Sequence, residues 1–218
     1  MPKQSRADRP ISRSQMKLLR RQQLIESTIE SIAKRGFAET TMADVAEGAG
    51  LSRGIVNFHF VSKEMLLNET LHHLAQEYRE VWRKALDRAG PAPVDRLMAL
   101  VAADFDTKVC NKKKVAVWYA FWGEARSRPY YREICAGFDR EHHVALRDAC
   151  QELIDQGDHH GPTADQIATA TAATTDGLWQ NLLIHPQSFD REEAKQNVYA
   201  ILAAIFPRQL ALRRVTAA

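Results

Sequence analysis

The sequence is poor in the features that mark secreted or membrane proteins. Its three cysteines, Cys110, Cys135 and Cys150, are an odd number without a C-x-x-C spacing, so neither a disulfide framework nor a zinc ribbon is expected. The longest apolar run, Val115 to Trp122, has eight residues, whereas about 20 are needed to cross a bilayer. The first 15 residues lack the apolar segment of a secretory signal. We therefore expect a cytoplasmic protein without a membrane partner.

Segments that alternate apolar and polar residues between hairpin turns are also missing, so no sheet is expected. Val115 to Trp122 has the composition of a buried strand, but no partner strand is available. Helical spacing dominates and predicts an all-α fold. The first expected helix ends at Gly36. The others are expected at 42–49, 52–59, 62–86, 94–106, 112–125, 129–156, 163–184 and 191–206. Their predicted N-caps include Thr41, Ser52, Ser62, Asn111, Ser127, Thr163 and Asp190.

Charge is distributed unevenly along the chain. Residues 1–63 contain 11 Lys and Arg against 6 Asp and Glu, whereas the remaining residues contain 19 against 21. A basic N-terminal part indicates contact with a polyanion, although a solvated basic tail would give the same count.

Residues 42–60, MADVAEGAGLSRGIVNFHF, have the steric layout of a helix-turn-helix. Ala46 lies where the first helix must be small, and Gly50 lies where the turn needs a positive φ. Leu51 and Val56 would lock the two helices together. Several matched positions favour this motif over a plain helical hairpin.

The N-terminal part of the chain resembles the TetR family of one-component bacterial repressors, over roughly residues 20–67. The resemblance rests on Gly36-Phe37, Thr40-Thr41, Val45-Ala46, Ala49-Gly50, Leu51-Ser52, Gly54, His59-Phe60 and Ser62-Lys63-Glu64. It implies a three-helix DNA-binding domain, a C-terminal helical domain for ligand binding and dimerisation, and a homodimer on double-stranded operator DNA. We expect a basic flexible leader at 1–15, the DNA-binding domain at 16–61 and the ligand-binding domain at 62–218. The long helix from Ser62 to Leu86 would couple the two domains.

Three C-terminal segments are similar to the BetI-type branch of that family, which represses glycine betaine synthesis genes in response to choline. They are Ala120-Phe121-Trp122, Pro129-Tyr130-Tyr131 and Asp176-Gly177-Leu178-Trp179. The resemblance implies a repressor that is released by a small effector such as choline or another quaternary amine.

The helix at 52–59 would enter the major groove of DNA. Arg53 is the candidate for a guanine contact, because its planar fork can meet O6 and N7 together, with a solvated charge as the alternative. Asn57 stands where the family commonly has a tyrosine, and it could read adenine or hold a phosphate. His59 could contact a phosphate or pack the turn. The remaining candidates for contact with the DNA backbone are Thr41, Ser52, Gly54 and Lys63.

Aromatic residues are concentrated in the second half of the chain. A box of aromatic rings with a carboxylate suits a quaternary ammonium, which has no hydrogen-bond donor and is attracted to ring faces. The candidates are Trp118, Trp122, Tyr130 and Trp179, with Asp176 or Glu124 as the anion; ordinary core packing would also explain these rings.

Three other functions compete with this interpretation. A helical enzyme could use Asp104, Asp106, Glu124 and histidines, but the chain has no repeated Glu-x-x-His pair, phosphate loop or nucleophile motif. A metal-responsive regulator could use His72-His73, His142-His143 or His159-His160, although adjacent helical residues point about 100° apart and seldom chelate together. We therefore expect no catalytic residue, cofactor or metal site. A helical interaction protein would leave the helix-turn-helix unexplained, and the small residues at 168–173 suit a dimer bundle or a monomer core.

Overall fold

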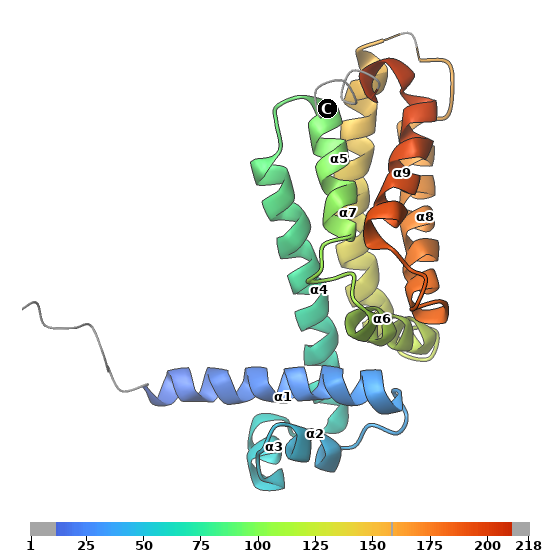
Figure 1. Cartoon of the computed structure of the whole chain (residues 1–218). Helices are drawn as coiled ribbons and strands as arrows, with labels where there is room; N and C mark the ends of the chain where they lie inside the picture. Colours follow the sequence, from blue (N-terminus) through green and yellow to red (C-terminus); the bar gives the residue numbers. More distant parts are fainter. Residues whose placement is uncertain (1–11, 158, 211–218) are drawn as a thin grey trace, which may run out of the picture. The chain divides into compact units, whose positions relative to one another are not determined.

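The computed structural model describes residues 12–157 and 159–210, which form helices joined by short loops, without a strand (Figure 1). The predicted all-α fold is confirmed. The described helices are α1 (Arg13–Arg35), α2 (Met42–Gly48), α3 (Arg53–His59), α4 (Lys63–Arg88), α5 (Pro93–Asp104), α6 (Lys112–Glu124), α7 (Pro129–Asp155), α8 (Ala164–Ile184) and α9 (Arg191–Ile205). Among them, none combines the length and the hydrophobicity needed to cross a membrane.

The chain divides into two compact units, Met1–Thr70 and Leu71–Ala218. The division falls inside α4, later than the boundary expected between residues 61 and 62. Of the expected flexible leader, residues 1–11 lie outside the described residues. Ser12 caps α1, so residues 13–15 belong to that helix rather than to a leader.

Side-chain caps explain where most of the helices begin. Thr41 and Thr163 each form a capping box, with Asp44 and Gln166 respectively. Helices α3, α4, α6 and α9 are capped by Ser52, Ser62, Asn111 and Asp190, in that order. These predicted caps are confirmed.

The predicted cap at Ser127 is wrong. Helix α7 begins at Pro129 after Arg128, without a side-chain cap. Proline has a φ suited to the first helical turn and needs no acceptor for a backbone N–H there, so a capping side chain is dispensable. Ser127 instead donates from Oγ to the carbonyl of Glu124, at 3.1 Å, and closes the turn after α6.

In the first unit, α1 packs against α2, and α2 packs against α3. Ala46 and Val56 are buried, as the helix-turn-helix pattern predicts, whereas Leu51 is half-buried. Gly50 has φ +63°, and Leu51 N donates to the carbonyl of Ala46 at 2.9 Å across the turn. The turn therefore uses the positive φ that glycine adopts without strain.

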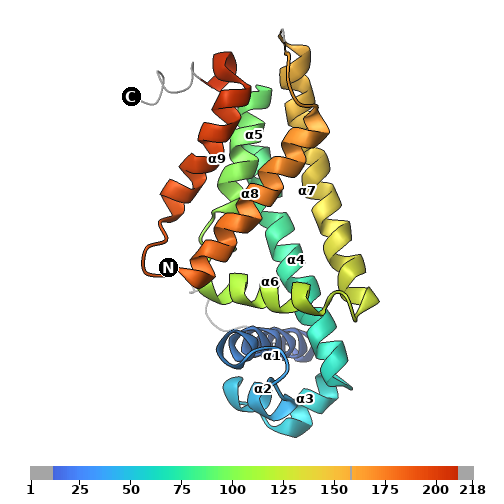
Figure 2. The same cartoon turned by 90° about the vertical axis from the view of Figure 1, so that its right-hand side faces the viewer.

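In the second unit, α5 lies against α7 and α9, α8 lies against α7 and α9, and α6 contacts α7 and α8 (Figure 2). Apolar side chains fill the space between these helices, among them Leu97, Leu100, Leu146, Ile167 and Leu202. One carboxylate, Asp104 at the end of α5, is buried in the same layer and is only 1% exposed. A buried charge is costly unless it has partners, so polar partners are expected around Asp104.

Candidate functional site

Helix α3 presents a polar face to solvent in the first unit. Arg53, Gly54 and Asn57 are exposed, whereas Val56 is fully buried and anchors the helix on α2. Phe58, on the same helix, is 73% exposed, which is unusual for a phenylalanine. The exposed face thus offers a guanidinium, an amide and an aromatic ring, all of which can contact bases.

Thr41 and Lys63 lie at helix starts in the same unit and already have partners. The hydroxyl of Thr41 donates to Asp44 Oδ2 at 2.6 Å, and this bond, with that of the Thr41 backbone, lowers the pKa of Asp44. Lys63 Nζ donates to the carbonyl of Ala38 at 3.2 Å. Thr41 is exposed and Lys63 is half-buried, so both are placed at the surface.

His59 is the last residue of α3 and is half-buried. Its Nδ1 is buried and has no hydrogen-bond partner among the described residues, while Arg21 donates to its backbone carbonyl at 3.4 Å. Burial lowers the pKa of His59, and the positive charges of Lys17 and Arg21 lower it further. A neutral, inward-facing imidazole favours the packing role over the phosphate contact.

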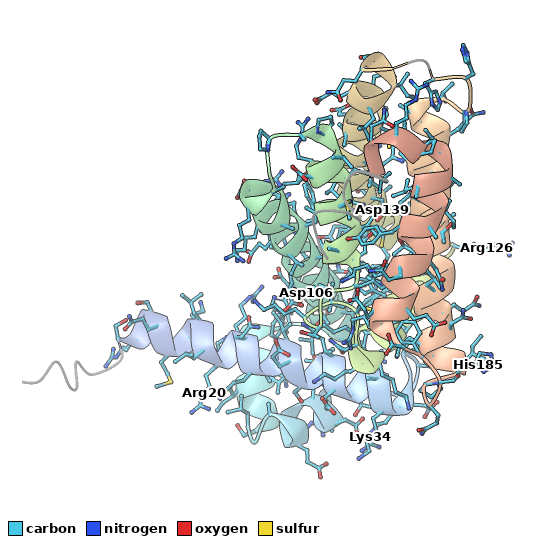
Figure 3. The ribbon with its side chains drawn as sticks, turned by 45° about the horizontal axis from the view of Figure 1, so that its top comes forward. Arg20, Lys34, Asp106, Arg126, Asp139 and His185 are labelled. Carbon is cyan, nitrogen blue, oxygen red and sulfur yellow. The ribbon has the colours of Figure 1, made fainter. Side chains whose placement is uncertain are left out.

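The basic residues of α1 border α3. Lys17 Nζ lies 5.8 Å from the ring centroid of Phe58. The guanidinium of Arg21 lies 4.6 Å from the ring centroid of Phe60. Arg21 also forms an ion pair with Glu69 at 2.9 Å. Figure 3 labels Arg20 and Lys34, both on α1. Positive charge in this unit is therefore carried by a described helix as well as by the segment before it.

The second unit contains a small cavity of about 250 Å³. This volume lies below the ~300–1,000 Å³ of pockets for drug-sized ligands, so it suits a small molecule. Five helices, α4 to α8, contribute to its lining, which consists of Tyr78, Asp104, Trp122, Asp139, His142, His143, Ala172, Thr175 and Asp176. Figure 3 labels Asp139, which α7 contributes.

Asp104 forms the floor of this cavity. Tyr78 donates its hydroxyl to Asp104 Oδ1 at 2.7 Å, and the hydroxyl of Thr175 lies 3.5 Å from Oδ2. Trp179 Nε1 donates to the backbone carbonyl of Asp104 at 3.0 Å. Burial raises the pKa of Asp104 to about 7, although both hydroxyls act in the opposite direction.

His142 lies beside Asp104 on the floor and is 5% exposed. Its Nε2 is 3.3 Å from Asp104 Oδ1, but the geometry does not make a hydrogen bond, and Nε2 has no other partner among the described residues. Burial lowers the pKa of His142 to about 4. The imidazole is therefore neutral near pH 7 and does not balance the charge of Asp104.

Asp139 and Asp176 lie at the solvent-exposed side of the cavity. The surrounding walls nevertheless desolvate them and raise the pKa of each to about 6, and the charge of a neighbouring aspartate adds to the effect. The lining contains three carboxylates and neither a lysine nor an arginine. Once these groups ionise, the cavity attracts a cation.

Trp122 supplies the large aromatic surface of the lining. Tyr119 packs edge-on against it with ring centroids 4.9 Å apart, and Trp118 lies behind it at 5.9 Å. Tyr119 also donates its hydroxyl to the backbone carbonyl of Asp176 at 2.8 Å. This contact ties the aromatic wall to α8, which carries one of the two outer carboxylates.

The expected ligand residues fall into three groups. Trp122 and Asp176 line the cavity. Trp118 and Trp179 are buried next to lining residues, at 6% and 4% exposure, and support them. Glu124 and Tyr130 do not line the cavity: Glu124 pairs with Arg128 Nε at 3.2 Å, and Tyr130 is 46% exposed. The sequence interpretation missed Tyr78, Asp139 and His142.

The histidine pairs do not assemble a metal site in the part of the chain that the structure describes, where no group of three or more His, Cys, Asp or Glu could hold a metal ion. His142 faces the floor of the cavity, whereas His143 Nε2 pairs with Asp165 Oδ1 at 2.8 Å. The two rings point apart, as adjacent residues of a helix do.

Two family models match the chain. Residues 93–207 match the C-terminal domain of BetI-type transcriptional repressors, and residues 24–70 match the N-terminal domain of the bacterial tetR regulatory proteins. The HTH-type transcriptional regulator BetI of Paraburkholderia xenovorans LB400 is 32% identical over 181 residues, which are 82% of this chain and 89% of that protein. BetI 1 of Chromohalobacter salexigens is 29% identical over 184 residues, 84% and 89% of the two chains.

Solved structures with the same fold include a protein described as a transcriptional regulator from Pseudomonas aeruginosa PAO1. Its TM-score is 0.77 at 24% identity, with 89% of this chain and 93% of the other covered. A regulator from Saccharomonospora viridis, crystallised in complex with choline, has a TM-score of 0.74 at 22% identity, with 84% and 94% covered. At these identities the likeness establishes the fold.

Proposed function

The chain belongs to the BetI-type branch of the TetR family of bacterial regulators, and from that premise we propose that it is a repressor released from its operator by a small cation. Members of the family are transcriptional regulators rather than enzymes. They bind operator DNA and small-molecule effectors, usually as dimers. We further propose that this chain acts as a homodimer in the cytoplasm, where operator DNA is found.

The observation that carries the choice of effector is the composition of the cavity. Asp104, Asp139 and Asp176 supply negative charge, Trp122 supplies a ring face, and the volume admits only a small ligand. A quaternary ammonium such as choline fits this chemistry, because it needs charge and aromatic faces rather than acceptors for N–H groups. The choline complex of the Saccharomonospora viridis regulator supports the same class of ligand.

Release would follow from a shift between two conformations. An effector can move such an equilibrium only by its difference in affinity for the two states. Without a cation, the three carboxylates repel one another as they ionise, and we propose that the empty cavity therefore favours a different conformation from the one that fits the cation. Helix α4 begins at Lys63 and carries Tyr78 of the cavity lining, and we propose that it transmits the change.

On the DNA side, we propose that α3 is the recognition helix. Arg53 and Asn57 would contact base edges, and Gly54 would allow close approach to the backbone. Thr41, Ser52 and Lys63 would contact phosphates. His59 would serve mainly to pack α3 against α1, because its Nδ1 is buried and its pKa is lowered, while Arg21 of α1 holds its backbone carbonyl.

A gel-shift titration with the DNA flanking the gene of this protein tests the proposal. We expect binding of a dimer to a near-palindromic site, a steep loss of affinity with rising salt, and release on addition of choline. Asp176→Asn should keep DNA binding and lose release, whereas Asp148→Asn, the same change on the exposed surface of α7, should keep both. Binding that is insensitive to salt, or release that is unaffected by Asp176→Asn, would contradict the proposal.

A further inference from the structure

We propose that Phe58 is a specificity-determining residue of the DNA-binding unit, and that its ring covers the methyl group of a thymine in each half of the operator. This inference rests on the proposed function, in which α3 is the recognition helix. It adds to that function a base contact that uses no hydrogen bond.

Phe58 exposes most of an apolar ring to water. Its side chain is 73% exposed, and among the large apolar residues that the structure describes only Val61 is more exposed. Leaving a phenyl ring in water forgoes the free energy of burying it. The ring nevertheless has defined neighbours: it meets the ring of His59 edge-on, with centroids 5.2 Å apart, and Lys17 Nζ lies 5.8 Å from its centroid. Phe58 is therefore held at the surface with most of its area free for a partner.

The position of Phe58 on α3 places it on the same face as the candidates for base contact. Arg53 and Asn57 are four residues apart and form one column of exposed side chains. Gly54 and Phe58 form the neighbouring column. Helical side chains lean toward the N-terminus, so the ring of Phe58 leans toward the turn of Gly54. A Cβ at Gly54 would meet only Ser52 Oγ, at 3.8 Å, so the space beside the glycine is open.

Helix α3 is short enough for both columns to lie in one groove of DNA. It has seven residues. At the rise of an α-helix, Phe58 lies only about 7.5 Å along the axis from Arg53. The major groove is about 12 Å wide and admits a helix. A contact of Arg53 with a base edge therefore brings the ring of Phe58 close to the neighbouring base pairs.

The charge around the ring indicates DNA rather than an apolar protein surface. Lys17 of α1 lies beside the ring, and α1 has no acidic residue before Glu26. Arg53 shares the exposed face of α3. Burial lowers the pKa of His59, and the charges of Lys17 and Arg21 lower it further, so the potential at this end of α3 is positive. An apolar ring among cations suits a polyanion that carries apolar groups.

Thymine is the base that matches a phenyl ring. In the major groove adenine, guanine and cytosine present hydrogen-bond donors and acceptors, whereas thymine adds its C5 methyl group. A phenyl ring has no polar atom, so over another base it would cover groups that lose water without gaining a partner. The ring of Phe58 therefore favours a thymine over the other three bases.

Replacing thymine by uracil deletes this methyl group and keeps the base-pairing groups. The DNA flanking the gene of this protein is amplified with dTTP or with dUTP, and the affinity of the full-length protein for each fragment is measured by gel shift. We expect the wild type to bind the uracil fragment about fourfold more weakly for each methyl group lost from the contact. With two half-sites the loss should reach roughly tenfold or more.

Three variants assign the effect to the ring. Phe58→Ala should bind the thymine fragment more weakly and lose most of the preference for thymine over uracil. Phe58→Leu keeps an apolar side chain and should retain much of that preference. The matched control is Leu18→Ala, which truncates another exposed apolar residue of the same unit, on α1, and should keep the wild-type preference. Thermal melting reports whether each variant folds, and the comparison on the wild type needs no variant.

The outcomes separate this inference from the proposed function. Equal affinity of the wild type for the two fragments would overturn the thymine contact and leave a DNA-binding repressor standing. A folded Phe58→Ala that loses affinity for both fragments by the same factor would also overturn it, because the ring would then act only through the structure of α3. Binding of neither fragment by the wild type would overturn the proposed function and this inference together.

Discussion

The hydroxyl of Tyr78 on α4 donates a 2.7 Å hydrogen bond to Oδ1 of Asp104 on α5, inside the second unit. The bond joins two groups whose ionised forms are both penalised by burial. Burial, followed by the charge of Asp104, raises the pKa of Tyr78 well above its usual value, so the phenol stays a donor. The same bond lowers the pKa of Asp104, but desolvation outweighs it and leaves that pKa at about 7. The floor of the cavity is thus poised to change charge near neutral pH.

We predict that effector binding is linked to proton release. The pKa of Asp104 is about 7 and those of Asp139 and Asp176 are about 6, against 3.8 for an ordinary aspartate. Raised values mean that the folded, ligand-free protein holds protons that the unfolded chain has lost. Stability from these groups is therefore fully present below about pH 4 and is lost as pH rises through 6 to 7. A bound cation favours the ionised forms, so its affinity should rise between pH 5.5 and 8.

Calorimetry in buffers of different ionisation enthalpy measures this proton release directly. Melting curves between pH 5 and 8 measure the matching loss of ligand-free stability. Asp176→Asn should reduce the number of protons released, whereas Asp148→Asn should not. An affinity that stays constant across this pH range would show that the carboxylates do not ionise on binding.

Two tryptophans should respond differently to truncation. Trp122 lines the cavity and is half-buried, so Trp122→Ala should weaken choline binding by about 0.5 to 2 kcal/mol, the range of a cation–π contact, and leave DNA binding unchanged. Trp179 is 4% exposed and donates to the backbone of Asp104, so Trp179→Ala should cost roughly 3 to 5 kcal/mol of stability. Thermal melting, calorimetry and gel shift of both variants check this. A stable Trp179→Ala that only loses the ligand would show that its ring contacts the effector directly.

Most of the fold was predictable because local signals agree along the chain. Thr41, Asn111 and Thr163 are capping residues that precede helical spacing, and each caps the helix that it predicts. Gly50 has the positive φ that its place in the motif requires. Ser127 gave a wrong prediction because a helix near Ser127 and Pro129 could begin either with a serine cap or with proline in its first turn. Only the backbone geometry decides between the two.

The cavity was predictable only in part. Trp122 and Asp176 were found because aromatic and acidic residues stand out in sequence. Tyr78 follows Leu71 and Leu74 at helical spacing, like any residue of an apolar stripe, and nothing local distinguishes a tyrosine in the core from one in a cavity wall. Asp104 interrupts an apolar segment, which is a usable signal, but it was considered only for an enzyme. Asp139 looks like any surface carboxylate until α7 is placed beside α8.

Two glycines of the first unit should behave in opposite ways. Gly50 has φ +63° in open space, so Gly50→Ala should destabilise the protein by about 1 to 2 kcal/mol through backbone strain alone, and Gly50→Asn by less. Gly54 lies in α3, and a Cβ there would meet only Ser52 Oγ at 3.8 Å, an ordinary contact. Gly54→Ala should therefore raise stability by about 0.5 to 1 kcal/mol while weakening DNA binding, if the DNA backbone approaches it closely. Melting and gel shift measure both effects. Unimpaired DNA binding by Gly54→Ala would exclude that close approach.

Arg53 and Lys63 should divide the recognition of bases from the recognition of phosphates. Arg53 is the exposed first residue of α3, and a guanidinium that meets a guanine should contribute about 1 to 3 kcal/mol of discrimination. Arg53→Ala should therefore lose affinity for the operator but little for random DNA.

Lys63 lies at the start of α4 and is half-buried. Its Nζ donates to the carbonyl of Ala38, which precedes α2. Lys63→Ala should weaken operator and random DNA alike and reduce the slope of log affinity against log salt by about one. Binding isotherms for both variants on both DNAs, at several salt concentrations, measure these differences. Glu47→Gln, at an exposed position of α2, adds a control for a change of charge in the same unit. Equal losses on operator and random DNA for Arg53→Ala would assign Arg53 to the phosphates, and a loss confined to the operator for Lys63→Ala would assign Lys63 to the bases.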